Sequence, residues 1–87
     1  MKYAEPRPYA DPEKAARRIM EIAHTIEPGP QGQIHIEKIN GPMLYKDSAH
    51  PAEYWAGMRR AIENGWLVMH ESGTFVTFTP SGADLFA

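Results

Sequence analysis

The sequence predicts a small α+β domain of three helices, a short strand, a two-stranded β-hairpin and a short C-terminal helix. Residues 11–26 and 51–64 place apolar side chains at helical spacing, each between start and stop signals. Residues 67–78 alternate apolar and polar side chains on both sides of Ser72 and Gly73, as a hairpin does. The 87 residues are 43% hydrophobic and 23% charged, which is typical of one globular domain.

Residues 1–10 predict an extended arm ahead of a folded domain at 11–87. The four-residue sequence YAEP at 3–6 is repeated, with one change, as YADP at 9–12. The prolines of this segment favour polyproline-like backbone over helix. We expect the arm to pack on the domain or to fray, with docking of its tyrosines on a partner as the alternative.

The first helix has a clear start. Asp11 is a good N-cap, Pro12 suits the first helical position, and Glu13 lies near the positive end of the helix dipole. The expected apolar face is Ala15, Ile19, Ile22, Ala23 and Ile26, and the expected solvated face is Lys14, Arg17, Arg18 and Glu21.

Two less regular elements follow. Residues 33–36, QIHI, predict a short strand in which Ile34 and Ile36 share one side. Residues 36–46 have apolar residues at helical spacing, but Pro42 follows an Asn-Gly pair and should interrupt a helix. We therefore expect one short, broken helix there.

The helix at 51–64 begins with Pro51 and stops at Gly65, which suits a left-handed cap. Its expected buried stripe is Tyr54, Trp55, Met58, Ala61 and Ile62, with Glu53, Ala56, Arg60 and Glu63 on the opposite side. Trp55 and Trp66 lie beside core positions, so core packing is favoured over a role in stacking on bases.

In the hairpin, a two-residue turn at Ser72 and Gly73 fixes which residues face each other. The opposed pairs are Glu71 with Thr74, His70 with Phe75, Met69 with Val76, Val68 with Thr77 and Leu67 with Phe78. Leu67, Met69, Val76 and Phe78 then face the core, while Val68, His70, Phe75 and Thr77 form the exposed face. Thr79 and Pro80 predict the cap and first residue of a last short helix.

Charge is distributed unevenly along the chain. The net charge is −2, all nine Lys and Arg lie at or before Arg60, and residues 61–87 carry only Glu63, Glu71 and Asp84 as charged side chains. Any attraction to phosphate must therefore come from the first two thirds of the chain.

The sequence gives little support for catalysis. Its four histidines fall on different predicted elements, it has no cysteine, and no acidic cluster has metal-ligand spacing. We expect no enzyme activity, no metal and no cofactor. A signal-peptide core and a membrane-spanning run are both absent from the sequence, so we expect a cytoplasmic protein with no membrane partner.

Residues 58–82, MRRAIENGWLVMHESGTFVTFTPSG, look like the end of a recognition helix that runs through Gly65 into a β-wing. With the order of elements over about residues 12–86, this stretch resembles the winged helix-turn-helix superfamily, and the TP.G pattern resembles that of MarR- and PadR-like regulators. The resemblance implies that the helix at 51–64 enters a DNA major groove. The implied DNA-binding residues are Arg59, Arg60, Glu53, Ala56, Gly57, Lys46 and Lys38, with Ala56 and Gly57 allowing close approach.

One feature departs from that pattern, because the hairpin tip carries Glu71 where a DNA-gripping wing offers Lys or Arg. Arg59 is also placed to pair with Glu63 one turn on, as an ordinary solvated residue. Two functions stay open, and the sequence favours the first of them. One is a DNA-binding transcriptional regulator, dimerising through the arm or the first helix. The other is a protein-interaction module that docks a partner through the arm and the hairpin face with Val68 and Phe75.

Overall fold

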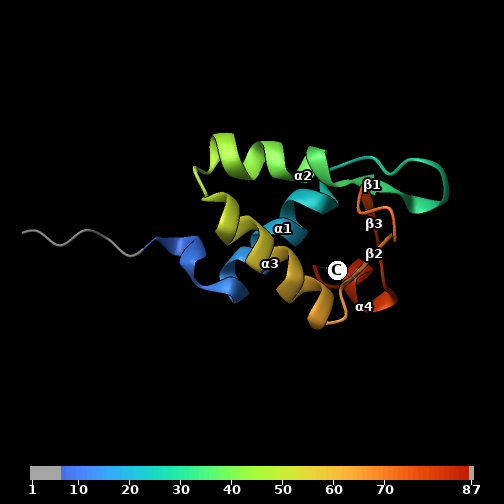
Figure 1. Ribbon diagram of the computed structural model, residues 1–87. Coiled ribbons are helices and arrows are strands. Elements are labelled where there is room, and N and C mark those ends of the chain that lie inside the picture. The colour runs from blue at the N-terminus through green and yellow to red at the C-terminus, as the bar shows by residue number, and fades with distance from the viewer. Residues whose placement is uncertain (1–6, 87) are drawn as a thin grey trace, which may run out of the picture.

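Three main helices, a three-stranded antiparallel sheet and a short C-terminal helix make up the fold of residues 7–86, the part of the chain described by this computed structural model (Figure 1). The main elements are α1 (Pro12–His24), β1 (Ile34–His35), α2 (Ile36–Gly41), α3 (Pro51–Glu63), β2 (Leu67–Met69), β3 (Phe75–Phe78) and α4 (Pro80–Ala83). In Figure 1, α2 runs along the top, α1 and α3 cross beneath it, and the sheet with α4 lies to the right. The predicted α+β class is confirmed.

The start of α1 follows from its first residues. The Asp11 carboxylate accepts a hydrogen bond from the Glu13 backbone N–H at 2.9 Å, and Pro12 takes the first helical position. The predicted apolar face is confirmed, since Ala15, Ile19, Ile22 and Ala23 are buried. Of the predicted arm, residues 1–6 lie outside the described part, and Pro8–Ala10 form a 3-10 turn rather than extended backbone.

The predicted break after α2 takes an unexpected form. Gly41 and Pro42 keep helical backbone angles, and the chain continues as a π-helical segment, η3 (Pro42–Lys46). Pro42 has no N–H to donate, so the α-helical hydrogen-bond pattern cannot pass through it unchanged. The wider pattern appears instead, with the Asp47 N–H donating to the Pro42 carbonyl at 3.0 Å.

The predicted hairpin register is confirmed, with Leu67 opposite Phe78 and Met69 opposite Val76. The predicted two-residue turn is wrong, because the Gly73 N–H donates to the His70 carbonyl at 2.9 Å. The turn therefore runs over Glu71 and Ser72, and Gly73 takes the left-handed conformation that follows it, with φ of 75°.

The sheet has the order β1-β3-β2, so β3 lies in the middle. β1 is shorter than the predicted strand, because Ile36 already begins α2. Ile34 pairs with Val76 and both are buried, while His35 pairs with Phe75 on the exposed side. The sheet therefore has one core face and one face toward solvent.

The core collects apolar side chains from α1, the α2–η3 segment, α3 and the sheet. Its largest fully buried members are Tyr54, Ile19, Met20, Ile34, Ile39, Met43, Met58, Leu67 and Val76. Tyr54 donates its hydroxyl to the Ile36 carbonyl at 3.4 Å and so ties α3 to α2. Burial raises the pKa of the Tyr54 hydroxyl to about 12.

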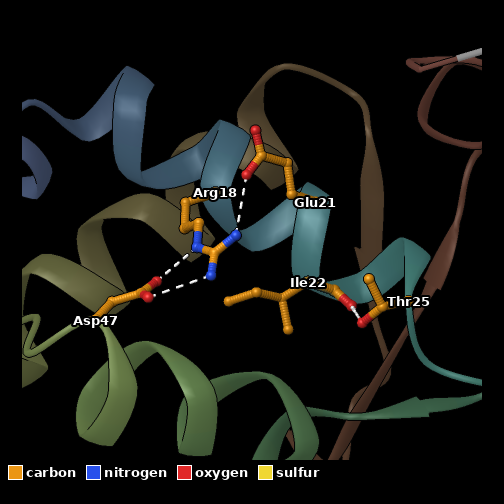
Figure 2. Close-up of polar contacts among 5 residues, drawn as sticks. All are labelled: Arg18, Glu21, Ile22, Thr25 and Asp47. Atoms are coloured by element: carbon orange, nitrogen blue, oxygen red, sulfur yellow. Dashed lines mark hydrogen bonds and ion pairs between the residues drawn. The ribbon is translucent and has the colours of Figure 1, made fainter.

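Ion pairs between distant residues join the helices at their polar edges. Arg18 of α1 donates to both carboxylate oxygens of Asp47, which follows η3, and to Glu21 at 3.1 Å (Figure 2). The hydrogen bonds that Asp47 accepts from Arg18 raise the pKa of the Arg18 guanidinium. Arg18 was expected on a solvated face, but it is half-buried and connects α1 to the start of the loop before α3.

Candidate interaction surface

The predicted buried face of α3 is wrong, because the helix is rotated about its own axis relative to the prediction. Its buried residues are Tyr54, Gly57, Met58 and Ala61, while Trp55 is 44% exposed and Ile62 is half-buried. The rotation follows from Gly57, which lies against α1. Because a glycine has no side chain, α1 approaches α3 most closely on that side and turns Trp55 outward.

Gly57 was predicted to allow close approach of DNA, and this placement is corrected. A Cβ atom at Gly57 would lie 2.6 Å from the Cβ of Ala15 and 2.9 Å from its carbonyl carbon. Gly57 therefore forms part of the contact between α1 and α3 and is buried in the core.

Glu53 was expected to accept a hydrogen bond from a base, but residues of the chain itself already bind it. Arg7 donates to its two oxygens at 2.8 and 3.0 Å, and the His50 backbone N–H donates at 2.9 Å. The Arg7 hydrogen bond, together with that of His50, lowers the pKa of Glu53 from 4.5 to about 2. Its side chain is only 13% exposed.

Arg60 is also paired within the fold. Its Nε donates to Glu13 of α1 at 2.8 Å, and Asn64 donates to the same carboxylate at 3.2 Å. The hydrogen bond from Arg60 lowers the pKa of Glu13. The predicted pair of Arg59 with Glu63 is replaced by one of Arg60 with Glu63, at 3.7 Å between nitrogen and oxygen.

Three predicted cations remain exposed without an ion pair in the part of the chain that is described. They are Arg59 on α3, Lys38 on α2 and Lys46 at the end of η3. Ala56, also predicted at the interface, is half-buried on α3.

An apolar groove lies between α3 and β2, with a volume of about 260 Å³. It is lined by Trp55, Met58, Arg59, Ile62 and Met69, and we refer to these five residues as the α3–β2 groove. The Trp55 ring stands edge-on to the ring of Tyr54, with centroids 5.0 Å apart. Because Tyr54 is fixed in the core, it supports Trp55 in its exposed position.

A second groove, of about 360 Å³, lies on the other side of Arg59, between α3 and the start of α1. It is lined by Asp11, Pro12, Glu13, Ala56, Arg59, Arg60 and Glu63. Three carboxylates and two guanidiniums give this lining a net charge of −1. An approaching phosphate therefore meets both signs of charge there.

The hairpin offers little for a polyanion to bind. Glu71 is exposed at its tip, and no Lys or Arg follows Arg60 in the sequence. On the exposed face of the sheet, Phe75 stacks on His70 with ring centroids 4.3 Å apart and has His35 on its other side at 6.0 Å. Val68, on the same face, is 54% exposed.

Sequence reasoning missed Trp55 and Met69 as surface residues and Arg7 and Glu13 as ion-pair partners. The outward position of Trp55 had one signal in the sequence. Tyr54, Met58 and Ala61 form a helical stripe that passes through Gly57 and leaves Trp55 at its edge. The ion pairs join residues 46 and 47 positions apart, which no local pattern indicates.

Within residues 7–86, no group of three or more His, Asp or Glu side chains is arranged to hold a metal ion. None of the helices described is both long and apolar enough to cross a bilayer. Comparison of the chain with protein-family models, with curated proteins and with solved structures finds no match.

Proposed function

We propose that this chain is a winged-helix domain. Support comes from the order of its elements, α1-β1-α2-α3-β2-β3, and from the sheet order β1-β3-β2. In that assignment α3 is the recognition helix and the β2–β3 hairpin is the wing. This assignment names only the fold. Winged-helix domains bind different classes of partner, so the activity has to be inferred from the surface of α3.

We propose further that the domain is a protein-interaction module whose partner occupies the α3–β2 groove. The composition of this groove is the observation that carries the proposal. Met58 at its floor is 1% exposed, so the side chains that a partner can reach are one Trp, one Met, one Ile and one Arg. Trp, Met and Arg are enriched in the cores of protein–protein interfaces, and Trp and Arg dominate their binding energy.

The charges around α3 also favour a protein partner over duplex DNA. Of the two arginines expected to contact DNA, Arg60 is paired with Glu13, and only Arg59 has no ion pair among the described residues. The wing would bring Glu71 toward a phosphate. A duplex would therefore have to break one ion pair and tolerate one repulsive contact.

The groove replaces the hairpin face as the proposed docking site. Phe75 on that face is half-buried and already packed against two histidine rings. By contrast, Trp55 and Met69 lie where a partner side chain can reach both of them.

DNA binding remains a second candidate function, supported by one specific observation. Arg59, Lys38 and Lys46 are exposed and carry no ion pair in the described chain, and they lie on α3 and on the segment that precedes it. A winged-helix domain that reads DNA uses these two elements to contact bases and backbone.

Site-specific photo-crosslinking tests the docking proposal. A benzophenone amino acid is placed at Trp55, and in a matched control at Tyr45, which is an 87% exposed aromatic residue on η3. We expect covalent protein adducts from position 55 and few from position 45, because only the first lines the groove. Equal yields at the two positions, or adducts to DNA alone from position 55, would contradict the proposal.

A further inference from the structure

We infer that the partner in the α3–β2 groove is a second copy of this chain, with the two α3 helices antiparallel across a two-fold axis. The inference rests on the proposed docking function and names its partner. Most homo-oligomers are closed by such an axis, and the contact patch must then be complementary to itself.

The exposed side of α3 meets that requirement. At about 100° per residue, Trp55, Arg59, Ile62 and Glu63 lie within an arc of about 100° on the helix surface. The patch therefore combines two apolar side chains with one positive and one negative charge. Ala52 is also exposed on this side, and its small side chain allows another helix to approach closely.

The two charges are positioned for reciprocal pairing. Arg59 and Glu63 are one turn apart on the same side of α3, and both are exposed. Arg59 forms no ion pair within residues 7–86, and Glu63 has only the long contact of 3.7 Å with Arg60. When two antiparallel α3 helices meet midway between these positions, Arg59 of each copy faces Glu63 of the other.

The same arrangement fills the groove. Trp55 lies six residues before the midpoint, about 9 Å along the helix axis. The two-fold axis places it the same distance beyond the midpoint of the second copy. In that copy α3 has ended there, at Glu63, and the chain continues toward β2. Trp55, Arg59 and Ile62 belong both to the patch and to the α3–β2 groove, so a second α3 that lies on the patch covers the groove.

A charge-exchange experiment tests this dimer. Arg59→Glu alone sets two acidic residues against each other at both contacts, and Glu63→Arg alone sets two arginines against each other. We expect the parent protein to be a dimer by sedimentation equilibrium and each variant to dissociate about tenfold more readily or worse. An equimolar mixture of the two variants should form a heterodimer, because both contacts then join opposite charges.

The control is Lys46→Glu, which reverses a charge outside the patch and should leave the parent dimer intact. Circular dichroism of each variant shows whether it is folded. A parent that is monomeric at every concentration, or a mixture of folded variants that stays monomeric, would overturn the inference. If position 55 then crosslinks to a different protein, only the second copy is excluded; if it yields no protein adduct, the docking proposal fails as well.

Discussion

Leu67→Ala is expected to lower the free energy of unfolding by about 2 to 5 kcal/mol, because it removes a fully buried side chain from the core. The loss is large against the roughly 4 to 13 kcal/mol expected for a chain of this length. Chemical denaturation measures it. The matched control is Val68→Ala, one residue further along β2, where the side chain is 54% exposed and the expected loss is under about 1 kcal/mol.

This pair of variants also tests the hairpin register, since a shift of one residue would exchange the buried and exposed faces of β2. A larger loss for Val68→Ala than for Leu67→Ala would show that the faces are reversed.

Gly57→Ala is expected to destabilise the fold by about 1 to 3 kcal/mol, even though alanine is the better helix former. The added Cβ would lie 2.6 Å from the Cβ of Ala15, and neither residue has a rotamer through which to relieve the clash. The two helices must move apart instead, which costs packing along their whole contact. Thermal and chemical denaturation both report this change.

Gly41→Ala provides the matched control. Gly41 also has helical backbone angles, with φ of −54° and ψ of −60°, but an added Cβ would meet no atom within 4 Å outside its two chain neighbours and the backbone of its own helix. We expect this variant to lose no more than about 1 kcal/mol, because the lower entropy cost of ordering alanine offsets the restriction that Pro42 places on the helical backbone of a preceding residue with a Cβ. Similar losses in both glycine variants would refute the close crossing of α1 and α3.

The parts of the fold that depend on neighbouring residues could be predicted from the sequence. Asp11 and Pro12 fixed the start of α1, and the alternation on both sides of the hairpin fixed the pairing of β2 with β3. Such signals are local, because a cap and a strand pair each involve a few side chains whose positions follow from the backbone.

The candidate site could be predicted only in part, for reasons that are not local. A glycine in a helix gives no apolar signal, so the predicted stripe was centred on Met58 and included Trp55 in place of Gly57. Glu53 and Arg60 were treated as free because their partners, Arg7 and Glu13, are far away in the sequence. Whether a charge on α3 can bind a ligand depends on these tertiary contacts, which residue spacing does not reveal.

These corrections change the balance between the two candidate functions. The implied DNA site had seven residues, of which Arg59, Arg60, Glu53, Ala56 and Gly57 lie on α3. Of these, Gly57 packs on α1 and two others form ion pairs within the fold. The surface that α3 leaves open next to β2 is instead apolar with a single arginine. We therefore favour a protein partner for this surface.

Titration of a random-sequence DNA duplex at low salt tests this conclusion most directly, since a protein that reads a DNA groove must also show salt-dependent non-specific binding. With the parent protein we expect no saturable binding tighter than a Kd of about 0.1 mM. The contradicting result is tighter binding that weakens as salt is added. Its log–log slope against salt would fall by about one unit in Arg59→Ala and stay unchanged in the charge-matched control Arg17→Ala.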